Sequence, residues 1–311
     1  MKYKTKKSLL ADIALLFTTM IWGGGFVAVK DALNSITPLY MMAVRFLIAS
    51  ILMALIFFKT IKKITKKDIL YGCIVGIFLF TGFATQTIGL QYTTVGKQAF
   101  LTATYVVIIP FLVWAVEKKR PDIYSIFSTI LALSGIGFLN LTDGFKLSMN
   151  FGDWLTLICA VFFAAHIVAI SHFSRKSNPI ILSVTQMLFT GILSLISALL
   201  FEPKFNGISK DGFISIFYLV VFSTMIAFLI QNIAQKYAHP NHVGIILCLE
   251  SVFGAILSII ILNEVFTSHM ILGCMAIFIA ILISETKLNF IKTLFKSKEK
   301  VNAKNSIKCS E

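Results

Sequence analysis

Charged side chains are scarce in this chain of 311 residues: only 14% of its residues are Asp, Glu, Lys or Arg, while 57% are hydrophobic. The mean hydropathy of +0.87 lies far above the range of soluble globular domains. The shortage of charge therefore excludes a soluble domain and predicts a polytopic membrane protein.

Acidic residues are scarcer still, with 14 Asp and Glu against 28 Lys and Arg, and the formal net charge is +14. A nucleic-acid-binding protein would gather its basic residues on a folded polar face. Here the basic residues fall between apolar runs. We therefore expect no nucleic-acid partner and attribute the charge to membrane topology.

Cysteine is also rare, with five residues in the chain. Four of them lie inside apolar runs, Cys309 lies near the end, and no pair has the spacing of metal ligands. We expect no disulfide and no metal site. The basic N-terminus resembles a signal peptide, but the apolar run after it is too long and lacks a small-residue cleavage site. We expect a retained first helix.

The apolar residues form long runs, and a membrane-spanning helix needs about 20 of them. Ten runs reach this length, and the short connections between them predict that successive helices are antiparallel neighbours. These runs cover residues 9–29, 38–58, 69–91, 96–116, 122–140, 152–172, 179–200, 212–235, 242–262 and 268–285.

The connections between the runs are alternately rich and poor in Lys and Arg. The N-terminus, the even-numbered loops and the C-terminal tail hold 22 of them, the odd-numbered loops hold 5, and Arg45 lies within a run. Cytoplasmic segments carry the excess of Lys and Arg in membrane proteins. We expect a protein of the cytoplasmic membrane with both termini in the cytoplasm.

The two halves of the chain resemble each other. A shift of 141 residues pairs Asp12 with Asp153, Trp22 with Phe163, Pro38 with Pro179 and Arg45 with Gln186. A shift of 145 pairs Gln86 with Gln231, and one of 147 pairs Glu117 with Glu264, which predicts a two-residue insertion before the ninth run. Because each half has five runs, the repeat would be inverted, as in many transporters.

The predicted fold is therefore an all-α membrane protein of ten transmembrane helices built from two inverted five-helix repeats. Residues 1–141 would form the first repeat, residues 142–285 the second, and residues 286–311 a basic cytoplasmic tail. Anionic lipids of the inner leaflet are a candidate partner of that tail.

The chain resembles the EamA-type ten-helix members of the drug/metabolite transporter superfamily over essentially its whole length. The resemblance rests on Trp22-Gly-Gly-Gly-Phe26, Arg45-Phe46, Pro110, Glu117, Leu249-Glu-Ser-Val-Phe253 and Asn263-Glu264. The family often has Asn in place of Gly25 and Pro in place of Ser251. The resemblance implies a secondary carrier of small metabolites that works by alternating access without a bound cofactor.

Three ionisable residues lie deep in the runs: Arg45, His166 and Glu250. An ionisable group inside a bilayer is costly unless it is paired or hydrated, so all three are candidate functional residues. Trp22 and Arg45 lie about 10 Å below the outer surface by helical rise. The indole could therefore hold the guanidinium in an anion site. Alternatively, Arg45 is a structural residue bonded to carbonyls or a carboxylate.

Glu250 lies near the midplane, and its role remains open: ion partner of Arg45, proton-coupling carboxylate, acceptor that holds the ninth helix against its neighbour, or direct contact of the substrate. His166 is either held by a hydrogen bond in the packed interior or part of the site. Four uncharged polar residues could contact a substrate or join helices to one another, namely Gln86, Tyr105, Gln186 and Gln231.

Three consecutive glycines, Gly23, Gly24 and Gly25, predict a hinge or a close packing seam in the first helix. The repeat pairs Gly23 and Gly24 with Ala164 and Ala165. Glu117 and Glu264 precede the next runs, where a carboxylate would suit the positive end of a helix dipole.

The leading functional hypothesis is a secondary transporter that exports small metabolites such as amino acids or related compounds. A carrier of hydrophobic drugs is the alternative, favoured by 29 Phe residues. A channel would show a filter motif and an enzyme a cluster of catalytic residues, and neither pattern is present. The sequence predicts no oligomeric state.

Overall fold

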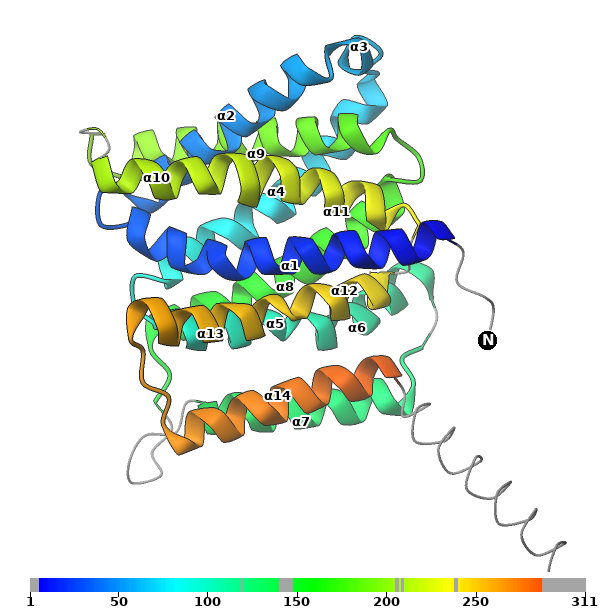
Figure 1. Cartoon of the computed structure of the whole chain (residues 1–311). Helices are drawn as coiled ribbons and strands as arrows, with labels where there is room; N and C mark the ends of the chain where they lie inside the picture. The colour runs from blue at the N-terminus through cyan, green and yellow to red at the C-terminus, as the bar shows by residue number, and fades with distance from the viewer. Residues whose placement is uncertain are drawn as a thin grey trace, which may run out of the picture.

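The computed structural model describes residues 6–118, 120–139, 148–204, 207, 210–237 and 240–286. Within these ranges all regular secondary structure is helical, and the helices run roughly parallel or antiparallel in one bundle (Figure 1). The predicted boundary between residues 141 and 142 and the predicted lipid-binding tail after residue 286 lie outside the described residues.

The first half of the chain supplies α1 (Lys6–Ala32), α2 (Pro38–Ile56), α3 (Phe58–Ile61), α4 (Lys66–Gly89), α5 (Val95–Ala103), α6 (Tyr105–Glu117) and α7 (Ile123–Leu139). The second half supplies α8 (Phe151–Phe173), α9 (Pro179–Phe201), α10 (Lys210–Tyr218), the π-helix η1 (Leu219–Ile226), α11 (Ala227–Gln235), α12 (Pro240–Cys248), α13 (Glu250–Leu262) and α14 (Ser268–Thr286).

Seven helical segments are long and apolar enough to cross a membrane. They are Leu10–Ala32, Pro38–Ile56, Lys66–Gly89, Val95–Val116, Phe151–Phe173, Pro179–Phe201 and Gly212–Gln235. Shorter apolar helices cover Ile126–Phe138, Ile246–Leu262 and Ser268–Ala280. These segments confirm a multi-pass, all-helical membrane protein.

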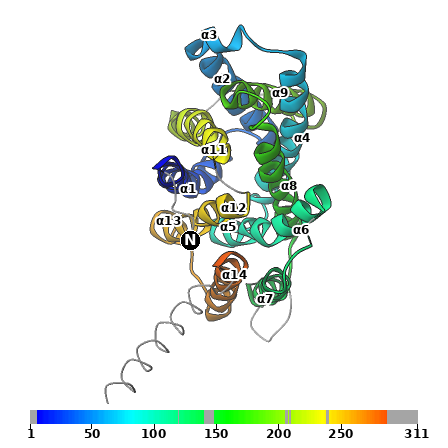
Figure 2. The same cartoon turned by 90° about the vertical axis from the view of Figure 1, so that its right-hand side faces the viewer.

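Helices from opposite halves of the chain pack against one another. In the end-on view, α2 lies beside α9, α4 beside α8, and α7 beside α14 (Figure 2). Helix α1 lies between α13 on one side and the α10–η1–α11 segment on the other. The core is therefore formed mainly by contacts between the two halves.

Gly23 of α1 lies where this helix meets α13, while Gly24 faces Tyr218 of α10 and Gly25 faces Ser223 of η1. A Cβ atom on Gly23 would lie 2.5 Å from the Cβ of Phe253 and 3.0 Å from the backbone nitrogen of Gly254. Only a residue without a side chain permits this approach. Helix α1 continues through all three glycines without interruption. The structure thus supports the predicted packing seam, and the hinge stays a prediction.

Two carboxylates join the halves by capping helices that are remote in sequence. Glu202, after α9, accepts hydrogen bonds from the backbone N–H groups of Leu39 (2.8 Å) and Tyr40 (3.0 Å) at the start of α2. Glu264, after α13, accepts them from Val95 (2.7 Å) and Gly96 (2.9 Å) at the start of α5. The first N–H groups of a helix lack internal partners, which explains both contacts.

The predicted role of Glu264 is therefore wrong in one respect: the carboxylate caps α5 of the first half and not the next helix, α14. Asn263, which ends α13, adopts a left-handed conformation with φ 53°. This turn redirects the chain after α13, and the Glu264 carboxylate meets the start of α5. The side chain of Glu117 lies outside the described residues.

The helix starts recur at fixed spacing. Helices α12, α13 and α14 begin 145 residues after α5, α6 and α7, from 95 to 240, from 105 to 250 and from 123 to 268. Helix α9 begins 141 residues after α2, from 38 to 179. The predicted two-residue insertion before the ninth run is therefore wrong. The spacing grows by four residues between the starts of α9 and α12.

Three interruptions of the helices lie close to the centre of the bundle. Thr104 separates α5 from α6, and Leu249 separates α12 from α13. The family often has a proline at position 251, and a proline could break the helix there. This chain has Ser251 instead, yet the helix is still interrupted at Leu249. Between α10 and α11 the chain forms the π-helix η1, a feature frequent at functional sites. Hydropathy does not reveal any of these interruptions.

Candidate functional site

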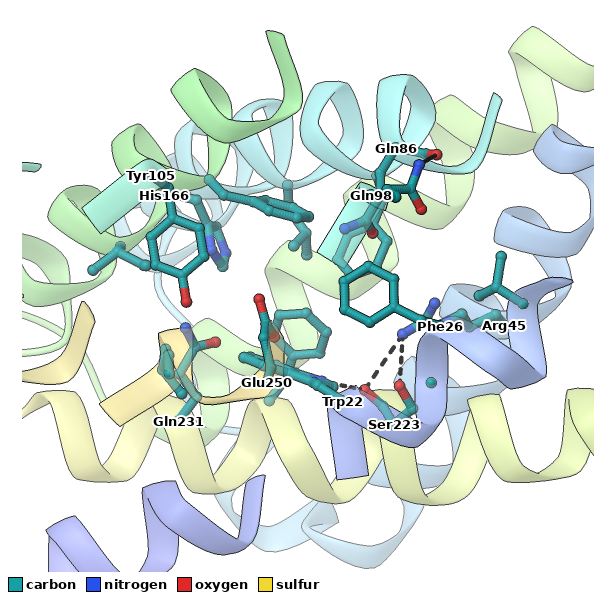
Figure 3. Close-up of a pocket in the computed structure, with 18 of the residues that line it drawn as sticks. Trp22, Phe26, Arg45, Gln86, Gln98, Tyr105, His166, Ser223, Gln231 and Glu250 are labelled. Atoms are coloured by element: carbon teal, nitrogen blue, oxygen red, sulfur yellow. Dashed lines mark hydrogen bonds between the residues drawn. The ribbon is translucent and has the colours of Figure 1, made fainter. Parts of the chain in front are cut away.

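A pocket with about 630 Å³ of open space lies between the two halves of the chain (Figure 3). Both halves contribute to its lining, and it lies against the three interrupted helices. Seven of the eight residues predicted as substrate contacts line it: Trp22, Arg45, Gln86, Tyr105, His166, Gln231 and Glu250. Their role in binding stays a prediction, but the structure brings them together.

Arg45 of α2 has only 2% of its surface exposed, and η1 supplies its hydrogen bonds. Its Nε donates to the hydroxyl of Thr224, and its Nη2 donates to the hydroxyl of Ser223 at 3.0 Å and to the Ser223 carbonyl at 3.4 Å. Its Nη1 has no hydrogen-bond partner among the described residues. The guanidinium lies 4.7 Å from the ring centre of Phe83. Arg45 is thus held against η1 by its Nε and Nη2 atoms.

Trp22 of α1 forms a hydrogen bond with Ser223, the residue that also binds Arg45. Its indole N–H donates to the carbonyl of Ser223 at 2.9 Å, and its ring packs against Phe228 at 5.2 Å between centroids. The rings that the described residues place against the guanidinium are those of Phe83 and Phe46, while the indole of Trp22 shares the partner Ser223 with Arg45. That the indole holds the guanidinium in an anion site stays a prediction.

Glu250 is the first residue of α13 and has 6% of its surface exposed. Its carboxylate makes no hydrogen bond or ion pair with any described residue. In Figure 3 it points into the open space of the pocket, as does the hydroxyl of Tyr105. Arg45 and Glu250 therefore line one pocket without forming the ion pair that was one of the predicted roles of Glu250.

His166 of α8 is held by a hydrogen bond of 2.9 Å between its Nε2 and the Oε1 of Gln186. The ring also packs against Phe228 at 6.0 Å between centroids. These contacts support the interpretation of a satisfied interior histidine, although the ring borders the pocket. Gln186 lies behind His166 and does not line the pocket. Ala164 and Ala165 precede His166 on the same helix, and Ala164 is fully buried.

Sequence reasoning missed Gln98 of α5. This side chain is fully buried, and its Nε2 donates to the carbonyl of Gln86 at 2.7 Å, while its Oε1 has no partner in the described part of the chain. The Oε1 of Gln231 also lacks one there. A buried polar side chain in an apolar run is the signal that could have revealed Gln98.

The aromatic wall of the pocket was also missed, since one Phe among 29 gives no signal in the sequence. Phe83 packs against two further rings, Phe163 at 5.1 Å and Phe228 at 6.0 Å between centroids. All three rings line the pocket. The pocket therefore combines polar groups with apolar aromatic surface.

The fold of this chain resembles that of a protein whose structure has been solved. A crystal structure of a protein superimposes with a TM-score of 0.69 and 16% sequence identity, and the match covers 90% of this chain and 98% of the other.

Proteins of similar sequence in several organisms are named as transporters. An uncharacterized transporter of Archaeoglobus fulgidus is 38% identical over 277 residues, covering 89% of this chain and 86% of the relative. The uncharacterized inner membrane transporter YedA of Escherichia coli is 27% identical, covering 79% and 83%. The uncharacterized transporter YetK of Bacillus subtilis is 26% identical, covering 84% and 82%.

The model of the EamA-like transporter family matches residues 9–141 and again residues 150–286. These two matches include α1 to α7 and α8 to α14 apart from a few terminal residues. The family and the relatives are membrane transporters and not enzymes. The chain therefore belongs to the EamA-like transporter family.

Proposed function

We propose that this transporter is a secondary carrier that exports small metabolites, such as amino acids or related compounds, across the cytoplasmic membrane by alternating access. One observation carries the proposal: both halves of the chain converge on a pocket that holds an arginine and a carboxylate without pairing them. Unpaired charges at membrane depth are costly and mark a path for a substrate or an ion.

The proposed architecture is ten spans in two inverted five-helix repeats. The constant spacing of 145 residues between α5, α6, α7 and their counterparts α12, α13, α14 supports it, as do the two matches of the family model. The breaks at Thr104 and Leu249 also lie 145 residues apart. Broken helices at related positions of two repeats are typical of transporter binding sites.

The proposed orientation places both termini in the cytoplasm. Its support is the excess of Lys and Arg in the even-numbered loops. Single-cysteine variants in an otherwise cysteine-free protein would test it: a cysteine at Lys59 should react with an impermeant maleimide only after the membrane is opened.

The proposed substrate has a carboxylate, an ammonium group and an apolar body. The free Nη1 of Arg45 is a donor for the carboxylate. The carboxylate of Glu250 and the unpartnered Oε1 of Gln231 are acceptors for the ammonium group. The aromatic wall suits an apolar side chain between these ends. An amino acid has all three features.

Uptake by proteoliposomes tests this proposal with a radiolabelled mixture of the proteinogenic amino acids as the probe. Arg45→Ala should lower uptake by about tenfold or more, because it removes a charge-assisted hydrogen bond to the substrate. Lys59→Ala is the control, since it removes an exposed cation outside the pocket. Equal uptake by both variants would show that Arg45 does not contact the substrate. Accumulation in inside-out membrane vesicles would identify export.

The aromatic wall favours a second candidate, a carrier of hydrophobic drugs. The same proteoliposomes distinguish the two when tetraphenylphosphonium replaces the amino acids. A drug carrier would transport this cation and would depend on Phe83 and Phe228. An amino acid carrier would not transport it.

A further inference from the structure

A second pocket lies away from the central one, at the end of the bundle where α4 and α9 begin and where α8 and α11 end. It is an open groove with about 1010 Å³ of space. Figure 1 shows α3, the α8–α9 connection and the end of α11 at the same end of the molecule as the N-terminus. The candidate spans Lys66–Gly89 and Pro179–Phe201 begin beside it, so the groove lies at the membrane boundary.

Three segments that are remote in sequence bring basic side chains to this groove. Lys63 and Lys67 come from the connection before α4 and from its first turn, Arg175 and Lys176 from the connection after α8, and Lys236 from the residue after α11. None of the five forms an ion pair with a carboxylate of the described residues. The amino group of Lys176 lies 2.8 Å from His172 Nε2.

The groove contains one acidic residue, Asp68, and its oxygens are already in use. Its Oδ2 accepts from the backbone N–H of Thr65 at 2.9 Å and from the Thr65 hydroxyl at 2.6 Å. Its Oδ1 accepts from the hydroxyl of Ser177. Asp68 therefore joins the two connections, and one carboxylate cannot balance the charge of five cations.

Other features of the groove also favour an anion. The five cations outnumber the single carboxylate, and the dipole ends of α4 and α9, which begin here, are offset by those of α8 and α11, which end here. Thr60, Tyr71 and Asn178 add groups that can donate hydrogen bonds. Three segments that are remote in sequence thus present both cations and hydrogen-bond donors to one concave surface.

We propose that this groove binds a phosphate-bearing anion that bridges the two halves of the transporter. The phosphate would contact Lys63 and Lys67 of the first half together with Arg175 and Lys236 of the second. Its source is either the headgroup of an anionic phospholipid or a soluble phosphate compound, since both present the same charged oxygens. Binding would hold this end of the two halves together. The proposal does not depend on the identity of the transported substrate.

Thermal unfolding of the purified full-length protein in a neutral detergent tests the proposal. The probes are short-chain phosphatidylglycerol, short-chain phosphatidylcholine, glycerol phosphate and inorganic phosphate. A ligand of the folded state raises the apparent melting temperature in a concentration-dependent way. A rise with phosphatidylglycerol alone identifies a lipid headgroup, and a rise with the soluble phosphates as well identifies the phosphate group itself. Either result supports the site.

A matched pair of double variants shows whether the rise in melting temperature comes from binding in the groove. Arg175→Gln with Lys236→Gln removes two cations from the groove, and Arg120→Gln with Lys59→Gln removes the same two residue types from exposed positions outside it. Each cation at a membrane surface contributes about fivefold in affinity, so the groove variant should need about 25-fold more ligand for half of the effect. The control should match the wild type.

Three results would overturn the proposal. The first is no rise in the melting temperature of the wild type with any of the charged probes. The second is an equal rise with phosphatidylcholine, which would assign the effect to the acyl chains. The third is an equal response of the groove variant and the control variant.

Discussion

At the scale of single residues, the two charged groups of the pocket differ in their hydrogen bonds. Arg45 obtains three hydrogen bonds from Ser223 and Thr224 of η1. Glu250 obtains none from the described residues. A buried carboxylate without a partner destabilises the folded state, and its retention in this pocket therefore points to function.

Glu250→Gln separates stability from transport. The amide has the same shape without the charge, so the variant should be at least as stable as the wild type, while uptake in proteoliposomes should fall. Asp153→Asn is the matched control, because the Asp153 carboxylate accepts from Thr93 at 2.8 Å and from Lys97 at 2.7 Å. That variant should lose about 1–3 kcal/mol of stability. A clear loss of melting temperature in Glu250→Gln would show a structural role instead.

Much of this site could be predicted from residue type and depth alone. Arg45, His166 and Glu250 are conspicuous because an ionisable residue is rare in an apolar run, and all three line the pocket. The partners of Arg45 could not be predicted, since they belong to a π-helix whose sequence looks like any other apolar run. Phe83 and Phe228 were hidden among many similar residues.

At the scale of elements, close packing and capping hold the halves together. Gly23 of α1 allows close contact with α13, and Glu202 and Glu264 join the ends of α9 and α13 to the starts of α2 and α5. The lengths of the helices followed from hydropathy. Their breaks and caps did not, because they depend on which backbone groups meet in the folded chain.

Gly23→Ala tests the packing seam between α1 and α13. The added methyl group would lie 2.5 Å from the Cβ of Phe253, so the helices must move apart, at a cost of about 1–3 kcal/mol. Gly137→Ala in α7 is the control, because nothing lies within 4 Å of an added Cβ there. Thermal unfolding should show a lower melting temperature for the first variant and an unchanged or higher one for the second. The same small effect in both would mean that α1 and α13 do not pack closely.

Glu264→Gln tests the cap that joins α13 to α5. Both carboxylate oxygens accept backbone N–H groups, and the amide would turn an NH₂ group toward one of these donors. We expect a loss of about 1 kcal/mol in thermal unfolding, with Glu202→Gln giving a similar loss at α2. No change in either variant would show that water caps these helices equally well.

At the scale of the whole molecule, the central claim is that two halves of one chain enclose a site that opens to one side of the membrane at a time. The fold supports it through the contacts between opposite halves and through the position of the pocket between them. The basic groove is a separate site on the same two halves, and an anion bound there would act on the motion and not on substrate recognition.

Counterflow in proteoliposomes tests the central claim most directly. Vesicles are preloaded with the unlabelled amino acid that most raises the melting temperature of the protein, and uptake of the labelled compound is followed. An alternating-access carrier should show a transient accumulation above equilibrium, absent in Arg45→Ala and retained in Lys59→Ala. Uptake without accumulation, together with single-channel currents in planar bilayers, would contradict the account.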